Sequence, residues 1–202
     1  MQEHNRASAW FDDLYKQHKD NHNNIPWARQ DVNPLLQTYL DKEQEHIGKA
    51  LVIGCGLGDD AHALDLAGYD VLAIDVSQTA LDLAQKRFSG SDILFEKQDI
   101  FDMPQKYHEH FDFVFEALTI QSLPIEFREK MINAVVNTVS KNGQLLVVAH
   151  KRNGEKKGPP WPLTKEEIDI FQVNGMKEIC HEIISEDSQV SNTKFRVLYE
   201  KV

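Results

Sequence analysis

Three glycines and the acids that follow them have the types and spacing to bind a nucleotide-like ligand. Gly54, Gly56 and Gly58 come directly after an apolar run, and Asp59 and Asp60 come next. Glycine tolerates positive φ and lets a ligand approach the backbone, so this run predicts a tight turn around a ligand. A dinucleotide-binding GxGxxG loop has glycine, not an acid, at the position of Asp59.

The acids around this loop indicate an adenosine ligand that carries positive charge. Two carboxylates at a helix N-terminus suit the helix dipole, but they would repel a diphosphate. Asp75 ends the next apolar run, where an adenosine ribose is held, and its carboxylate can accept from both hydroxyls. Asp99 ends the third run and is expected to meet the adenine amino group. S-Adenosylmethionine fits this pattern, because its sulfonium and amino groups are positive.

Methyl transfer from a sulfonium is an in-line displacement, which requires a nucleophile held about 3 Å from the methyl carbon. A thiolate or polarisable anion needs only desolvation and alignment, whereas an alcohol or amine more often needs a proton acceptor. Glu116 and His150, near the ends of two apolar runs, are the candidate catalytic residues, although they form no recognisable dyad. Trp10, Phe11 and Trp161 are the candidate substrate contacts, because aromatic side chains line small-molecule pockets.

Alternating apolar runs and helical periodicity predict the elements that position these residues. The strands are expected within 49–54, 70–77, 92–100, 111–120, 142–151, 176–185 and 194–202. The helices after residue 50 are expected within 59–69, 78–88, 126–140 and 164–175. The last two strands are too close in sequence for a crossover helix, so they should be antiparallel. The pattern predicts an α/β fold with a doubly wound, mostly parallel, seven-stranded sheet and an antiparallel C-terminal strand.

Capping residues predict where three of the helices begin or end. Gly68 is expected to stop the first of them, and Ser77 to cap the next. Thr164 is expected to form a capping box with Glu167.

Three further predictions concern the region between residues 126 and 151. Val139 completes the apolar face of the predicted helix, and the pair Asn142 and Gly143 predicts a turn that leads into the next strand. Arg128 at the start of that helix is expected to be solvated.

Composition narrows the class of protein and its partners. The 202 residues carry a formal charge of −10, contain two cysteines and are 41% hydrophobic. We expect a single domain over 1–202, with 1–47 a helical arm that covers the cofactor site. The acidic charge disfavours nucleic acid, and no apolar stretch is long enough for a membrane span. The cysteine usage is typical of the reducing cytoplasm. A monomer or homodimer that acts on a small molecule is expected.

A metal site is not expected from the sequence. Cys55 and Cys180 lie far apart and outside any CxxC pair, and we expect Cys55 to be a packing residue. His108 and His110 have ligand-like spacing, but they stand in a polar loop without a second cluster.

The stretch ALVIGCGLGDDAHALDLAGYDVLAIDVSQTALDLA resembles motifs I and II of class I S-adenosylmethionine-dependent methyltransferases. The LVIGCG pattern, the acid Asp60, the segment from WFDDLY to PWARQDVNPLL and the segment GPPWPLTKEEI narrow the resemblance. They are similar to the thiopurine S-methyltransferase group, which includes thiol, halide and thiocyanate methyltransferases. Arg128 resembles an arginine of that group. Where the group commonly has Asp-Arg at its fourth strand, expected here within 111–120, this chain has Glu116 and Ala117 and so departs from the group's pattern.

The resemblance implies a methyltransferase that uses S-adenosylmethionine and methylates a small soft nucleophile of the thiol, thiopurine, halide or thiocyanate type. It places the cofactor on Trp27, Gly54, Cys55, Gly56, Asp60, Asp75, Val76, Asp99, Ile100 and Glu116. The alternatives are methylation of another small metabolite, a tellurite-type detoxification, and a non-catalytic protein that binds an adenosine ligand. A nicotinamide-dependent oxidoreductase is disfavoured by Asp59 and by the antiparallel C-terminal pair.

Overall fold

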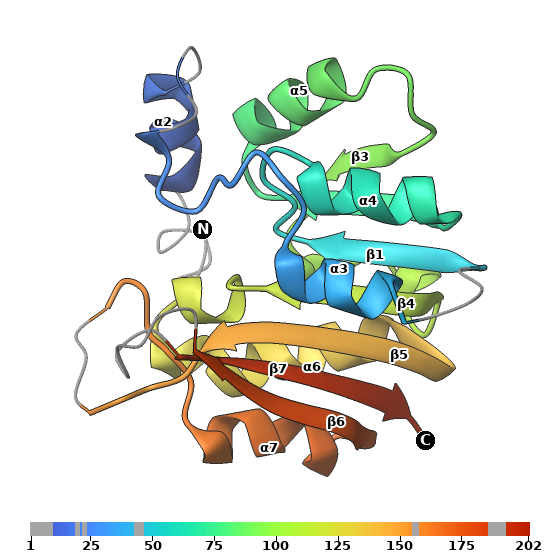
Figure 1. Ribbon diagram of the computed structural model, residues 1–202, viewed down its shortest axis with the longest axis vertical. Helices are drawn as coiled ribbons and strands as arrows, with labels where there is room; N and C mark the ends of the chain where they lie inside the picture. Colours follow the sequence, from blue (N-terminus) through green and yellow to red (C-terminus); the bar gives the residue numbers. More distant parts are fainter. Residues whose placement is uncertain (1–9, 19–20, 22–23, 43–46, 155–157, 186–192) are drawn as a thin grey trace. The chain divides into compact units, whose positions relative to one another are not determined.

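The structure, a computed structural model, describes residues 10–18, 21, 24–42, 47–154, 158–185 and 193–202 (Figure 1). The chain forms two compact units, Met1–Asp99 and Ile100–Val202. Within the described ranges, no helix is long and apolar enough to cross a membrane.

The described residues of the first unit form three parallel strands and four α-helices. Its strands are β1 (Lys49–Ile53), β2 (Asp70–Asp75) and β3 (Leu94–Lys97). Its helices are α2 (Trp10–Gln17), α3 (Pro34–Leu40), α4 (Asp59–Ala67) and α5 (Gln78–Arg87). β2 pairs in parallel with both β1 and β3. β1 and β2 are buried after their first residue, which is why both read as continuous apolar runs.

Helix boundaries in the first unit follow the predicted caps. The Ser77 side chain accepts a hydrogen bond from the Ala80 N–H and begins α5. Gly68 adopts a left-handed conformation and ends α4. Gly58 precedes α4 with φ +86°, and a Cβ there would lie 3.0 Å from the Ala84 Cβ. A side chain at residue 58 would therefore push α4 and α5 apart.

Four strands and two α-helices are formed by the part of the second unit that the structure describes. Its strands are β4 (Phe111–Ala117), β5 (Val139–His150), β6 (Met176–Ser185) and β7 (Thr193–Lys201). Its α-helices are α6 (Arg128–Thr138) and α7 (Lys165–Val173). Its 3₁₀ turns are η2 (Ile100–Asp102), η3 (Gln105–Tyr107), η4 (Ile120–Ser122) and η5 (Ile125–Phe127). The predicted capping box of Thr164 and Glu167 begins α7.

Strand pairing in the second unit confirms the expected reversal at the C-terminus. β4 and β5 are parallel, while β7 is antiparallel to β5 and to β6 (Figure 1). The two helices pack on one face of β7: the Tyr199 hydroxyl donates to the Ile168 carbonyl of α7, and Lys201 donates to the Val136 carbonyl of α6. The seven strands of the described residues agree with the predicted fold class.

Two predictions around residue 140 are wrong. Val139 lies in β5 rather than on the face of α6, and Asn142 and Gly143 lie inside β5 rather than in a turn before it. The register with β4 shifts there, so β5 carries an irregularity in which Asn142 has φ 63°. A Cβ on Gly143 would lie 2.9 Å from the Phe111 carbonyl oxygen. The Asn-Gly pair therefore serves a bulge and a close backbone contact, which local sequence does not distinguish from a turn.

The single-domain assignment, with 1–47 as an arm over the cofactor, stays a prediction. Residues 10–18 and 34–40 are helical for the most part, as their apolar spacing indicates, whereas residues 1–9 lie outside the described ranges.

Candidate functional site

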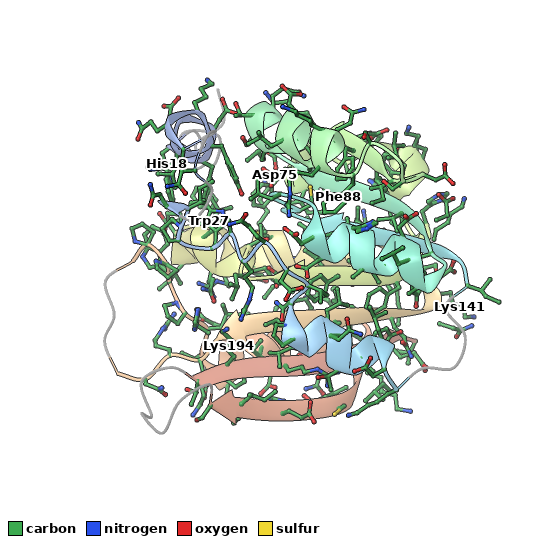
Figure 2. All side chains as sticks on the ribbon, turned by 45° about the horizontal axis from the view of Figure 1, so that its top comes forward. His18, Trp27, Asp75, Phe88, Lys141 and Lys194 are labelled. Carbon is green, nitrogen blue, oxygen red and sulfur yellow. The ribbon has the colours of Figure 1, made fainter. Side chains whose placement is uncertain are left out.

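Asp75 joins the glycine loop to the start of α5. Its Oδ2 accepts from the Gly56 N–H and its Oδ1 from the Ser77 N–H, each at 2.9 Å. The side chain lies at the end of β2 (Figure 2) and is only 8% exposed. Burial raises the pKa of Asp75, and the two N–H donors oppose that shift. Because a carboxylate oxygen has two lone pairs, each one can accept a further hydrogen bond from a hydroxyl.

Tyr15, a buried residue of α2, lies against this glycine loop. A Cβ on Gly56, which has φ +53°, would lie 2.8 Å from the Tyr15 hydroxyl oxygen. The Trp27 indole donates to that hydroxyl at 2.8 Å. Glycine is therefore required at residue 56 by backbone conformation and by the close approach of Tyr15.

Three predicted aromatic residues come together in the first unit. The rings of Trp10 and Phe11 stack at 4.1 Å between centroids. The Trp27 ring meets both edge-on, at 5.6 and 5.5 Å, and Tyr15 lies edge-on to Trp27 at 6.1 Å. Trp10 is 39% exposed, so the cluster presents an aromatic surface to its surroundings.

Asp12 fixes α2 to α5, and sequence reasoning did not single it out. Its Oδ1 accepts from the Ser77 hydroxyl at 2.7 Å and from the Thr79 N–H at 3.0 Å. The contact agrees with the position of α2 beside α5 (Figure 1). Desolvation acts to raise the pKa of Asp12, but hydrogen bonds from Lys16, Thr79 and Ser77 hold it below its usual value. A carboxylate from α2 thus caps the N-terminus of α5 across 65 positions of sequence.

The two acids after the glycines bind other parts of the first unit. Asp59 makes two hydrogen bonds to the Arg87 guanidinium, at 2.6 and 2.8 Å, and Arg87 also donates to the Leu57 carbonyl. Asp60 accepts from the Asn33 N–H at 2.6 Å. Burial raises the pKa of Asp60 to about 6. Asp59 therefore replaces a third glycine because its carboxylate holds the loop against the C-terminal turn of α5.

The remaining predicted cofactor residues of this loop and of β3 differ in burial. The Cys55 thiol is buried, and burial raises its pKa well above its usual range, as befits a packing residue. Val76 and Asp99 are half-buried, and Gly54 is exposed. Ile100 is 7% exposed and begins η2 in the second unit.

Glu116 is fully buried at the end of β4 in the second unit. Its Oε1 accepts from the N–H groups of Thr119 and Ile120, both at 2.8 Å. Its Oε2 has no hydrogen-bond partner among the described residues. Burial raises the pKa of Glu116 to about 7, against the lowering effect of the two N–H groups and of Arg128. Both protonation states of this carboxyl are therefore accessible near neutral pH.

Arg128 is buried, which contradicts the expectation that it is solvated. The side chain is 3% exposed because it turns toward the loop that follows β5 rather than toward water. Its Nη2 donates to the Trp161 carbonyl at 2.8 Å, and its Nη1 lies 3.6 Å from Glu167 Oε2. Burial lowers the pKa of Arg128. Among the described residues, its Nε and Nη1 atoms have no hydrogen-bond partner.

His150 and Trp161, predicted separately, are connected through Gln121. The His150 N–H donates to the side-chain oxygen of Gln121, and the Trp161 N–H donates to the Gln121 carbonyl, both at 2.7 Å. Nothing local in the sequence marked Gln121, since a polar residue after a strand is ordinarily a surface residue. Within the described part of the chain, no group of three or more His, Cys, Asp or Glu side chains could hold a metal ion.

Comparison with known proteins gives consistent relatives. The family model of thiopurine S-methyltransferase matches residues 13–201. Thiocyanate methyltransferase 1 of Brassica oleracea is 26% identical over 162 residues, which cover 78% of this chain and 71% of that protein. The Arabidopsis thaliana protein of the same name is 26% identical over 168 residues, covering 78% and 73%.

The fold resembles that of a solved methyltransferase over nearly its whole length. The magnesium protoporphyrin IX methyltransferase of Synechocystis PCC 6803, crystallised with bound S-adenosylmethionine, aligns with a TM-score of 0.74. The two sequences are 16% identical, and the match covers 97% of each chain. This likeness confirms the predicted Rossmann-like methyltransferase fold.

Proposed function

Because this chain belongs to the thiopurine S-methyltransferase family, we propose that its methyl acceptor is a small soft nucleophile such as a thiol, a thiopurine, a halide or thiocyanate. The chain is an S-adenosylmethionine-dependent methyltransferase. The observation that carries the proposal is the family match over residues 13–201. The two relatives whose alignments cover 78% of this chain are named for methylation of thiocyanate, which is an anion of this kind.

The residues of the glycine loop fit S-adenosylmethionine as their ligand. Asp75 is proposed to hold the ribose. Each of its oxygens already accepts one backbone N–H, from Gly56 or from Ser77, and can accept one more hydrogen bond from a hydroxyl. Asp60 adds negative charge near a cationic ligand, and Asp59 is neutralised by Arg87. When bound, the cofactor supplies an electrophilic methyl group on a positively charged sulfur.

The other predicted cofactor contacts keep the roles proposed for them. They are Trp27, Gly54, Cys55, Gly56, Val76, Asp99, Ile100 and Glu116. Trp10, Phe11 and Trp161 are proposed to contact the methyl acceptor, because a flat aromatic surface excludes water from a polarisable nucleophile.

The proposed acceptor class does not depend on a strong base in the protein. Glu116 Oε1 accepts from two backbone N–H groups, and burial raises the pKa of this carboxyl to about 7. The His150 backbone N–H donates to the Gln121 side chain. A thiolate or halide reacts once it is desolvated and aligned, so this arrangement suffices for a soft nucleophile. Glu116 and His150 remain the candidates for proton transfer if the acceptor enters as a neutral thiol.

The other functions considered from the sequence are less well supported. Methylation of another metabolite or of tellurite would use the same cofactor site, but the family match favours the soft-nucleophile class. A non-catalytic adenosine-binding protein is not favoured, because the relatives are named as enzymes.

We further propose a cytoplasmic protein, monomeric or homodimeric, without nucleic-acid or membrane partners. The formal charge of −10 supports the absence of a polyanionic partner, and the two unpaired cysteines suit a reducing compartment.

A panel of acceptors tests the proposal. Purified protein with methyl-labelled S-adenosylmethionine would be incubated with thiols, thiopurines, halides, thiocyanate, phenols and amines, and methylated products would be identified by mass spectrometry. The proposal expects kcat/KM at least about tenfold higher for a sulfur or halide acceptor than for any phenol or amine. A preference for an oxygen or nitrogen acceptor would contradict it, as would binding of the cofactor with no turnover on any acceptor.

A further inference from the structure

Gln121 occupies a junction in the second unit that none of the roles above explains. It lies in η4, four residues after the end of β4, and its side chain is 2% exposed. A buried amide costs free energy unless its polar atoms are used, so its contacts indicate why it is buried.

The two oxygens of Gln121 bind two separate segments. The side-chain Oε1 accepts from the His150 N–H at the last residue of β5, at 2.7 Å. The backbone oxygen accepts from the Trp161 N–H, also at 2.7 Å. Gln121 therefore fixes the distance between the end of β5 and the predicted substrate residue Trp161.

Trp161 is held from its other side as well. Arg128 donates to the Trp161 carbonyl at 2.8 Å, so both polar groups of the Trp161 backbone have buried partners. Arg152 donates to the next carbonyl, that of Pro162, at 3.0 Å and pairs with Glu167. The backbone that carries the indole is thus held by groups from η4, from the start of α6 and from the segment after β5.

The same network reaches both candidate catalytic residues. Glu116 Oε1 accepts from Thr119 and Ile120 and so fixes the start of η4, the turn that carries Gln121. The His150 carbonyl accepts from the Leu163 N–H at 2.9 Å, which closes the network behind Trp161. The Gln121 side chain supplies the link to His150, whereas its backbone carbonyl holds Trp161. Loss of the side-chain acceptor therefore releases η4, with Trp161 still bound to it, from the end of β5.

We propose that Gln121 is a positioning residue that places Trp161 for the methyl acceptor and thereby sets the specificity of the enzyme. The proposal rests on the proposed function, in which Trp161 contacts the acceptor. Gln121 acts through Trp161 and not on the reacting atoms. Its loss therefore raises KM for the acceptor and leaves cofactor binding unchanged.

The test compares three variants of the full chain. Gln121→Met keeps the length of the side chain but removes the acceptor for the His150 N–H. Gln121→Glu keeps a carbonyl-type acceptor in place. Gln172→Met makes the same chemical change at an exposed position of α7 and serves as the matched control.

The kinetic test compares the change in the acceptor KM with the change in the cofactor Kd. Gln121→Met is expected to raise the acceptor KM about tenfold, the scale of one buried hydrogen bond, with the cofactor Kd unchanged within twofold. Gln121→Glu is expected to recover most of that loss, and Gln172→Met to behave as the wild type. An unchanged acceptor KM in Gln121→Met would overturn the proposal, as would a matching increase in the cofactor Kd.

A second readout does not depend on turnover. The chain has three tryptophans, so 5-fluorotryptophan labelling gives three ¹⁹F resonances, and Trp161→Phe assigns one of them. Gln121→Met should shift the Trp161 resonance and leave those of Trp10 and Trp27 in place. A stationary Trp161 resonance would overturn the positioning role even if no acceptor were known. Failure of the proposed function would appear separately, as a wild-type protein that methylates no soft nucleophile.

Discussion

Asp75 at the end of β2 and Glu116 at the end of β4 are both buried carboxylates that accept from two backbone N–H groups. One oxygen of Asp75 accepts from the Gly56 N–H and the other accepts from the Ser77 N–H. Glu116 gives both bonds to Oε1, and its Oε2 has no partner among the described residues. The first arrangement fixes a loop in place, whereas the second leaves one oxygen of a carboxyl with a raised pKa without a hydrogen-bond partner among the described residues.

Of the substitutions considered, removal of the Asp75 carboxylate should have the largest effect on the free energy of unfolding and on cofactor affinity. Asp75→Ala leaves the Gly56 and Ser77 N–H groups without acceptors, so the free energy of unfolding should fall by about 3 kcal/mol. Cofactor affinity should fall about 10- to 100-fold, because a charged acceptor for the ribose is lost. Urea denaturation and calorimetry measure the two effects.

Asp75→Asn separates these effects, since the amide keeps one acceptor and loses the charge. Asp82→Asn on the exposed face of α5 is the control. Unchanged calorimetric affinity in both Asp75 variants would remove Asp75 from the cofactor site.

Glu116 should instead make the free energy of unfolding depend on pH. Its pKa is raised from 4.5 to about 7, so the folded state favours the neutral carboxyl. The resulting stabilisation is complete below pH 4.5 and is lost as the pH rises through 7. Relative to Glu116→Gln, the wild type should lose about 3 kcal/mol of unfolding free energy across this range.

Denaturation curves at several pH values measure this difference, with Glu126→Gln at an exposed position as the control. A constant gap between the wild type and Glu116→Gln would contradict the raised pKa.

The link between α2 and α5 should matter less. Asp12→Asn removes the charged cap on α5, which should cost about 1 kcal/mol. Hydrogen exchange at Thr79 and along α2 should become faster. The neighbouring Asp13 side chain is 71% exposed, so Asp13→Asn should change neither property. Equal effects of the two substitutions would show that Asp12 is not a specific anchor.

Asp59 should have the smallest effect of the acids compared. Asp59→Asn weakens a partly exposed pair with Arg87, so the unfolding free energy should fall by only about 0.5–1 kcal/mol, and less at high salt. Cofactor affinity should stay within twofold of the wild type, since Asp59 binds protein rather than ligand. A loss of affinity as large as that of Asp75→Ala would place Asp59 in the cofactor site.

The parts of the fold that could be predicted are those fixed by local chemistry. Ser77, Thr164 and Gly68 mark helix ends because their side chains, or the lack of one, satisfy groups only a few residues away. The antiparallel C-terminal pair followed from connection length alone. The predictions for Val139 and for the Asn142–Gly143 pair were wrong because a bulge depends on the neighbouring strand, which local sequence does not describe.

In the candidate site, residues that bind near neighbours in the sequence could be predicted, whereas residues that bind distant segments could not. The glycine loop, the acid at the end of β2 and the family could be identified from the sequence, because spacing along the chain defines each of them. The cap of Asp12 on α5, the burial of Arg128 and the contact of Gln121 with Trp161 became visible in the folded chain alone. Such contacts join segments tens of residues apart, and a polar side chain is matched with its distant partner only when folding excludes water from both.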